Sequence, residues 1–178
     1  MKIRISVNCG ITFKKFREAF DTVHNAGIPC IIHAGETDGP TSIRDAIEVA
    51  KPRRIEHGVR CIEDPGLMAY LKEKQTPLDV CPSSNVCLKV YPSLEKHSLP
   101  KLLDYGLNVT LNSDDPPMFN TTLTNEFSTC CEQFGWDRAL MVRLVLNALN
   151  VSLLPEPEKH SVLESVLRGF STLGFVPR

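Results

Sequence analysis

The sequence of 178 residues has a net charge of −1 and is 42% hydrophobic, which suits a compact globular chain and excludes a disordered one. A charge so close to neutral argues against nucleic acid or an anionic membrane surface as the main partner. No apolar run approaches the roughly 20 residues of a membrane span, and the first residues lack the apolar core of a signal peptide, so we expect a cytoplasmic protein.

Strands and helices are predicted to alternate along the chain. The alternation or clustering of apolar residues predicts strands at residues 3–7, 28–33, 54–59, 78–81 and 109–112. Helical spacing and capping residues predict helices at residues 13–23, 41–50, 64–71 and 99–105, followed by three more at 124–134, 137–150 and 157–170. No linker is long or polar enough to mark a second domain, so we expect residues 1–178 to belong to one domain.

The spacing of the strand ends indicates how the strands are connected. A strand, its crossover helix and the loops need about 25–35 residues, and the intervals between His33, His57, Cys81 and Asp114 are close to that length. The sequence therefore predicts βα units with a parallel sheet. Because a (β/α)8 barrel takes about 250 residues, four or five such units make roughly half a barrel.

Polar side chains follow the strands at the same end of the predicted sheet. They include His33 with Glu36, His57, the segment 83–85, and Asp114 with its neighbour. In a barrel they would converge on one mouth, and imidazoles with carboxylates at one mouth are the composition of a metal-dependent hydrolase. Each residue alone also has a simpler explanation, as a hydrogen-bonded structural histidine, a turn or helix cap, or a solvated glutamate.

Four segments resemble the adenosine deaminase family in their order and spacing. They are HAGET at residues 33–37, RIEHGV at 54–59, CPSSN at 81–85 and NSDDPP at 112–117. The resemblance runs from about Phe16 to the C-terminus. It implies the C-terminal half of a (β/α)8 TIM-type barrel of the metal-dependent hydrolase kind, followed by C-terminal helices, so residues 1–178 would be a partial domain. It also implies a zinc-dependent hydrolase that replaces the 6-amino group of a purine with oxygen.

The resemblance implies a role for each strand-end residue. His33 and Asp114 would be ligands of the Zn²⁺ ion. Glu36 would protonate the purine ring nitrogen N1 as hydroxide adds to C6, and His57 would orient that hydroxide. These roles fit the residue types, since zinc supplies the nucleophile and protonation relieves the charge that addition builds on the ring.

Three further residues would contact the substrate, a small-molecule purine nucleoside or base. By resemblance, Asp115 would hydrogen-bond N7 and Gly35 would line the pocket. Glu56 stands where adenosine deaminases commonly have Gly and adenine deaminases have Asp. A carboxylate there could accept a hydrogen bond from N9–H of a free base or crowd a ribose, or it could face the helices or solvent. We expect conversion of adenosine or deoxyadenosine to the inosine form, with adenine or a related adenosine derivative as the alternative.

The chain lacks the His-x-His pair that supplies two further zinc ligands in this family. Its histidines are His24, His33, His57, His97 and His160. We therefore expect only part of the ligand set, and an N-terminal half that is missing from this chain. Half a barrel has open strand edges, so we expect self-association, misfolding or complementation by the other half. The alternative of another class is a truncated, inactive family member that acts as an interaction protein.

Overall fold

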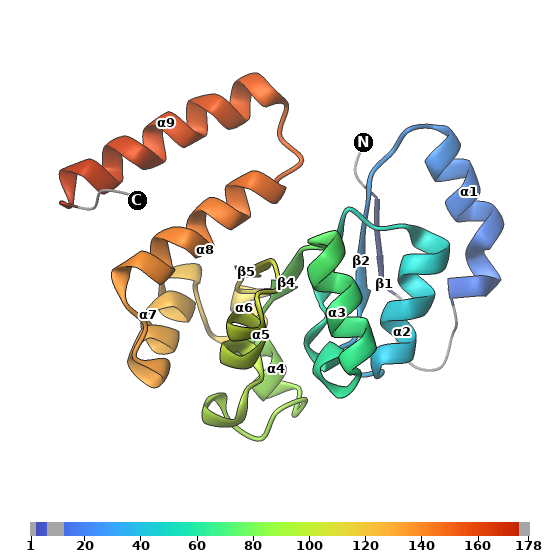
Figure 1. Ribbon diagram of the computed structural model, residues 1–178, viewed down its shortest axis with the longest axis horizontal. Coiled ribbons are helices and arrows are strands. Elements are labelled where there is room, and N and C mark those ends of the chain that lie inside the picture. Colours follow the sequence, from blue (N-terminus) through green and yellow to red (C-terminus); the bar gives the residue numbers. More distant parts are fainter. Residues whose placement is uncertain (1–2, 7–12, 175–178) are drawn as a thin grey trace.

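The described part of the chain forms a five-stranded parallel sheet (Figure 1). The computed structural model describes residues 3–6 and 13–174. Its strands pair in sequence order, β1-β2-β3-β4-β5, and every neighbouring pair is parallel. The strands are β1 (Ile3–Ser6), β2 (Cys30–Ala34), β3 (Arg54–His57), β4 (Leu78–Val80) and β5 (Val109–Leu111). The predicted strands are confirmed, except that Val7 lies outside the described residues.

The longer helices follow the strands as predicted. They are α1 (Arg17–Asn25), α2 (Pro40–Asp45), α3 (Pro65–Lys74), α5 (Leu99–Tyr105), α7 (Leu123–Phe134), α8 (Arg138–Val151) and α9 (Glu156–Thr172). A wider π turn over Ala46–Ala50 extends α2. The side chains of Asp64, Thr122 and Asp137 begin α3, α7 and α8 by accepting a backbone N–H three residues later, which satisfies a donor that the helix leaves unpaired.

Several short helices are additions to the predicted order. Two of them, α4 (Pro82–Cys87) and α6 (Pro116–Phe119), begin directly after the turn that follows a strand. The 3₁₀ turns η3 (Val59–Glu63) and η4 (Leu94–Lys96) are also additions, whereas η1 (Phe13–Phe16) forms the start of the helix predicted at residues 13–23. Both α4 and α6 carry Pro at the first helical position, where its missing N–H costs nothing. They are too short for helical periodicity to reveal them.

Two adjacent rows of the sheet have opposite characters. Strand pairing aligns Ile32, Ile55, Leu78 and Val109 in one row, and all four are fully buried. Because neighbouring residues of a strand point to opposite faces, the next row faces the other way. The apolar row packs against the helices in the core. The polar row therefore lies on the opposite face of the sheet.

The polar row consists of His33, Glu56, Asp79 and Thr110. Thr110 Oγ1 donates to Asp79 Oδ1 at 2.8 Å, and Arg54 Nε lies 3.1 Å from Asp79 Oδ2. Burial raises the pKa of the Asp79 carboxyl, and the charge of Arg54 opposes that rise. Charged groups are costly to bury without partners. The contacts of Asp79 with Thr110 and Arg54 offset that cost on this face of the sheet.

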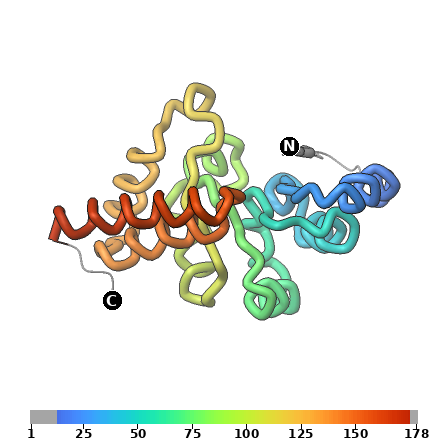
Figure 2. Tube along the Cα trace, turned by 90° about the horizontal axis from the view of Figure 1, so that it is seen from above, coloured from blue at the N-terminus to red at the C-terminus, as the bar shows by residue number. Residues whose placement is uncertain are grey.

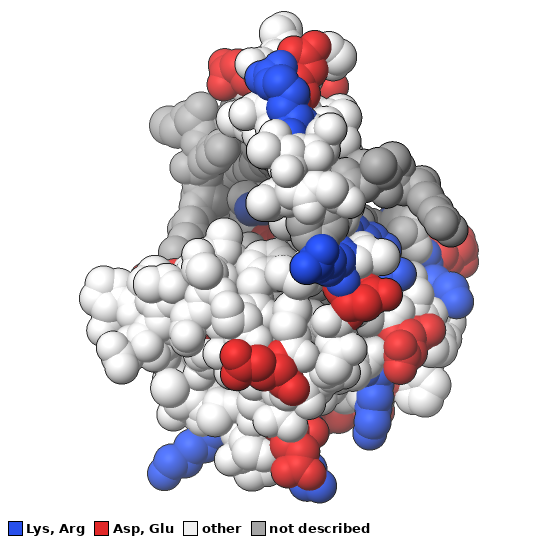
Figure 3. Space-filling model, turned by 90° about the vertical axis from the view of Figure 1, so that its left-hand side faces the viewer, with Lys and Arg blue, Asp and Glu red and all other residues white. Residues whose placement is uncertain are grey.

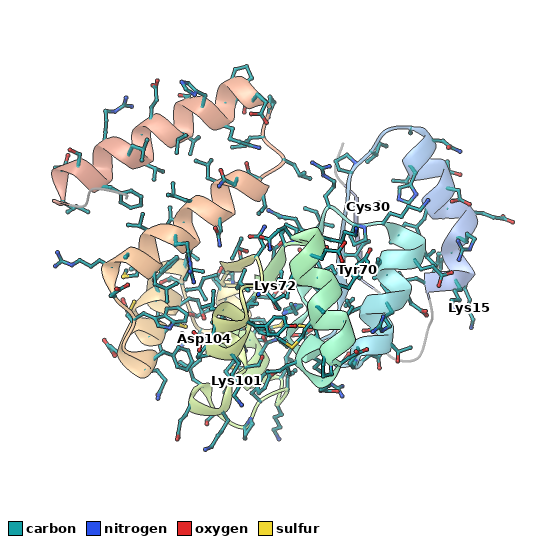
Figure 4. All side chains as sticks on the ribbon, viewed as in Figure 1. Lys15, Cys30, Tyr70, Lys72, Lys101 and Asp104 are labelled. Atoms are coloured by element: carbon teal, nitrogen blue, oxygen red, sulfur yellow. The ribbon has the colours of Figure 1, made fainter. Side chains whose placement is uncertain are left out.

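The C-terminal helices cover the β5 end of the sheet. Asn147 of α8 donates from Nδ2 to the carbonyl of Val109 at 2.9 Å. Helix α9 runs alongside α8 (Figure 2). Lys72 of α3 reaches toward α5, with its ammonium 5.1 Å from the centre of the Tyr105 ring (Figure 4).

The charged side chains are scattered over the face shown in Figure 3. Lys and Arg lie interspersed with Asp and Glu among uncharged residues there, and neither sign forms a continuous patch. Among the described helices, none has the combination of length and apolar character that crossing a membrane requires.

Candidate active site

Three of the predicted site residues form one cluster at the ends of the strands. His33 lies in β2, His57 ends β3, and Asp114 follows β5. Each offers one possible ligand atom, and these atoms lie within 4.8 Å of one another. The two imidazole rings are 5.1 Å apart, and His57 Nε2 is 3.9 Å from Asp114 Oδ2. Imidazole nitrogen and carboxylate oxygen are ligands that Zn²⁺ accepts, so the donor set fits that ion.

The backbone of this cluster is held in an unusual conformation. His57 has a φ of 66° and Asp114 a φ of 55°, in the left-handed region that non-glycine residues occupy at a cost of about 1–3 kcal/mol. Gly35 also has a positive φ, and a Cβ on it would lie 2.3 Å from Ile43 Cδ1. Only glycine therefore fits between β2 and α2 at this position, which lets the strand turn sharply before Glu36.

Glu36 is a buried acid beside His57. Its Oε1 accepts a hydrogen bond from Asn85 Nδ2 at 2.9 Å and lies 3.3 Å from His57 Nδ1. Burial raises the pKa of this carboxyl, and the nearby charge of Asp114 raises it further, against smaller opposing effects of His33 and Asn85. A carboxyl with a raised pKa holds its proton closer to neutral pH, which suits it to donate that proton in a reaction.

Glu56 contacts the metal-site histidine. Its Oε2 lies against His33 Nδ1, within the polar row of the sheet and on the lining of a cavity, so it faces neither the helices nor open solvent alone. A carboxylate on one ring nitrogen of a histidine favours the tautomer with the proton on that nitrogen, and so leaves the lone pair on the other. This contact orients the His33 ring and favours Nε2 as its ligand atom.

Two residues of the CPSSN segment enter the site without having been assigned a role. Ser84 Oγ donates to Asp114 Oδ2 at 2.8 Å, and Asn85 Nδ2 reaches both Glu36 and His57 Nδ1. Both residues are fully buried. Their position just after strand β4 marked them in the sequence as strand-end residues. Their hydrogen-bond partners could not be predicted, because these depend on how helix α4 orients the two side chains.

Asp115 is the predicted residue that stands apart from the cluster. It is exposed, and its carbonyl accepts the N–H groups of Met118 and Phe119 at the start of α6. Its predicted contact with N7 of a purine therefore stays a prediction.

A cavity of about 260 Å³ opens beside the cluster. His33, Glu56, His57 and Asp114 line it, together with Arg54, Asp79, Cys81, Asn112, Ser113 and Leu123. Glu36 and Gly35 instead line a much smaller hollow next to His33. A larger hollow of about 490 Å³ lies near the start of β2, and none of the predicted site residues lines it. The 260 Å³ cavity is therefore the candidate binding site.

The sheet of βα units with two histidines and an aspartate at its strand ends defines a class, the α/β-barrel hydrolases of the metal-dependent kind. The family model described as adenosine deaminase matches residues 6–168. The chain belongs to the adenosine deaminase family.

The similar proteins are about twice as long as this chain. An adenine deaminase of Sinorhizobium medicae is 42% identical over 152 residues, which are 85% of this chain and 47% of that protein. The crystal structure of adenine deaminase from Arthrobacter aurescens superposes with a TM-score of 0.89 at 33% identity, over 94% of this chain and 51% of that one. A Burkholderia ambifaria amidohydrolase with bound Zn has a TM-score of 0.84 at 21% identity, over 96% and 49%. The chain spans about half of each, which confirms the predicted half-barrel.

Proposed function

We propose that this chain provides the C-terminal part of the active site of a zinc-dependent deaminase, which hydrolyses the 6-amino group of a purine to an oxo group and releases ammonia. The observation that carries the proposal is Glu36, a buried acid with a raised pKa that lies 3.3 Å from His57 and beside the His33–Asp114 cluster. General acid catalysis needs such a group close to the reacting atoms.

The metal would be held by His33 and Asp114, with the remaining ligands from the segment that the family implies upstream. The fit rests on the donor atoms of the cluster and on the contact of Glu56 with His33 Nδ1. When bound, zinc supplies a hydroxide nucleophile from water near neutral pH. The similar Burkholderia ambifaria protein, which has bound Zn, makes zinc the first metal to test.

Glu36 and His57 have separate roles in the reaction. Protonated Glu36 gives its proton to ring nitrogen N1, which neutralises the charge that grows on the ring as oxygen adds to C6. His57 holds the attacking oxygen to one side of the ring. Its buried position, fixed by Asn85 and Glu36, limits the geometries that this oxygen can take, which is the advantage that orientation brings to catalysis.

The sequence alone led us to expect adenosine or deoxyadenosine as the substrate. The comparisons favour adenine instead. The Sinorhizobium medicae and Arthrobacter aurescens relatives are both adenine deaminases. Glu56 lines the candidate cavity, where a carboxylate can accept N9–H of a free base, a hydrogen that a nucleoside lacks. Adenosine and its derivatives are the alternative substrates.

The test compares the chain alone with a chimera in which it follows the N-terminal part of the Sinorhizobium medicae relative. We expect the chain alone to bind zinc weakly and to release no ammonia, because its ligand set is partial. We expect the zinc-loaded chimera to deaminate adenine faster than adenosine. The Glu36→Gln chimera should bind zinc equally well but lose at least about 100-fold in kcat.

Two outcomes would contradict the proposal in different ways. Stoichiometric, tight zinc binding and turnover by the isolated chain would contradict the partial ligand set. A folded chimera that binds zinc but releases no ammonia from adenine, adenosine or deoxyadenosine would favour the alternative of an inactive interaction protein.

A further inference from the structure

A buried relay of polar groups lies behind Glu36. His97 is 3% exposed and Asn85 is fully buried. His97 Nε2 lies 3.1 Å from Asn85 Oδ1, and Asn85 Nδ2 lies 2.9 Å from Glu36 Oε1. His97 comes from the loop before α5 and Glu36 from the loop after β2, so the relay joins two segments far apart in the sequence.

The backbone determines the tautomer of His97. The N–H of Leu99 donates to His97 Nδ1 at 3.0 Å, so Nδ1 carries a lone pair, and the neutral ring has its proton on Nε2. The Tyr91 ring packs against the imidazole with their centres 4.4 Å apart. Burial lowers the pKa of His97 to about 4, which keeps the ring neutral near pH 7.

That tautomer in turn determines which way the Asn85 amide points. The oxygen and nitrogen of an asparagine amide have nearly the same shape, so only hydrogen-bond partners distinguish its two orientations. Because His97 Nε2–H is a donor, Asn85 must present Oδ1 to it. The amide NH₂ group then faces the other side, where it donates to Glu36 Oε1 at 2.9 Å and lies 3.3 Å from His57 Nδ1.

We propose that His97 is a positioning residue for deamination, which acts through Asn85 to hold the carboxyl group of Glu36 in place. This inference rests on the proposed function of Glu36. Without the donor at His97, the amide can rotate and present Oδ1 to Glu36. Because Asn85 donates to Oε1, the proton of the Glu36 carboxyl group belongs on Oε2. A rotated amide would instead repel Oε1 or draw the proton onto it, so the carboxyl group would no longer present its proton in the same place.

The test uses two amide substitutions that keep different halves of the imidazole. In His97→Gln, the side-chain NH₂ can reach the place of Nε2 and donate to Asn85. In His97→Asn, the shorter side chain keeps an acceptor near Nδ1 for the N–H of Leu99 but lacks the donor. Both variants remove the ring and its packing on Tyr91, and they differ by one methylene group, so their thermal unfolding is measured alongside to separate lost packing from the lost donor.

In the chimera, we expect His97→Asn to lower kcat for adenine by about 100-fold, the size of effect that a small misplacement of a catalytic group has. KM should change by less than about 3-fold, since His97 does not touch the cavity. His97→Gln should restore most of kcat. Equal kcat in the His97→Asn and unsubstituted chimeras, or equal losses in both variants, would overturn the positioning role while leaving the proposed function intact.

A second measurement is independent of activity. In the 178-residue chain with ¹⁵N-labelled histidine, NMR should show His97 neutral near pH 7 with its proton on Nε2. The side-chain NH₂ protons of Asn85 should exchange slowly with water in the unsubstituted chain and in His97→Gln, and faster in His97→Asn. A proton on Nδ1 of His97 would overturn the relay even if no variant folds. If the unsubstituted chimera deaminates no purine, the proposed function fails, and this spectrum alone decides the relay.

Discussion

At the scale of single residues, the burial of His97 links stability to pH. Its pKa falls from 6.5 to about 4 on folding. Between these values the unfolded chain binds more protons than the folded one, so the free energy of unfolding decreases as the pH falls through this window. The full difference corresponds to about 3 kcal/mol.

Urea unfolding at pH 7 and near pH 4 measures this linkage. The raised pKa values of Glu36 and Asp79 act in the opposite direction, because the folded state then binds more protons and loses stability as the pH rises. Comparison with His97→Gln isolates the histidine. We expect the variant to lose less stability on acidification than the unsubstituted chain, and an equal loss in both would contradict the argument.

Glu56 provides a second prediction at this scale. Because Glu56 contacts His33 Nδ1, Glu56→Gln should weaken zinc binding by the chimera about 10- to 100-fold, the usual effect of losing a carboxylate behind a histidine ligand. Glu95→Gln, an exposed control, should leave the affinity unchanged. Competition with a chromophoric chelator measures both. Unchanged zinc affinity with a raised KM for adenine would assign Glu56 to the substrate instead.

The sequence predicts the residues of the cluster better than their partners. His33, Glu36, His57 and Asp114 could be found because each lies at the end of a strand or just after it, and parallel strands end at one edge of a sheet. The contacts of Ser84, Asn85 and His97 could not, because they depend on how a one-turn helix and a long loop orient their side chains. The contact of Glu56 with His33 depends on the strand register, which no local pattern specifies.

At the scale of elements, a buried glutamate joins helix α7 to helix α4, which carries Asn85 of the relay. Glu126 is 1% exposed. Its Oε2 accepts the N–H of Ser83 at 3.2 Å, and its Oε1 accepts the hydroxyl of Thr121 at 2.7 Å. The start of α4, and with it Ser84 and Asn85, is therefore anchored to a helix from the C-terminal part of the chain.

Removing this anchor should destabilise the protein. Glu126→Ala leaves the buried hydroxyl of Thr121 and the part-buried N–H of Ser83 without their acceptor, and we expect a loss of about 1–3 kcal/mol in the free energy of unfolding. Glu132→Ala, an exposed change on the same helix, should stay within about 0.5 kcal/mol. Denaturant unfolding measures both, and similar losses in the two variants would contradict the anchoring role.

The elements themselves were predictable in proportion to their length. Helices α7, α8 and α9 carry enough turns for apolar periodicity to appear, and the strands lie between clear turn signals. The π turn after α2 was not predictable, because a single extra residue in a helical turn leaves the apolar spacing almost unchanged. For α4 and α6, the Pro after each strand end was the available signal.

At the scale of the whole molecule, the two edges of the sheet differ. Helix α8 protects the β5 edge, where Asn147 donates to the carbonyl of Val109. Among the described strands, β1 has a neighbour on one side only. Unpaired strand edges recruit other chains, so we propose that the chain associates through the β1 side.

Sedimentation velocity over a range of concentrations tests this association. We expect species larger than a monomer to increase with concentration. The N-terminal part of the Sinorhizobium medicae relative, added as a separate polypeptide, should replace them with a one-to-one complex, because it would pair with the same edge. A monomer at all concentrations that ignores the added half would contradict the prediction.

The sequential order of the strands also affects how the chain folds while it is being translated. Each strand pairs with the one synthesised just before it, so every pairing closes a loop of similar, modest length. Translation adds about 5–20 residues per second, so a new βα unit emerges every few seconds. Until it does, the outer edge of the last strand in the sheet has no neighbour. The nascent chain therefore exposes a fresh strand edge after each unit, and slower translation should prolong each exposure.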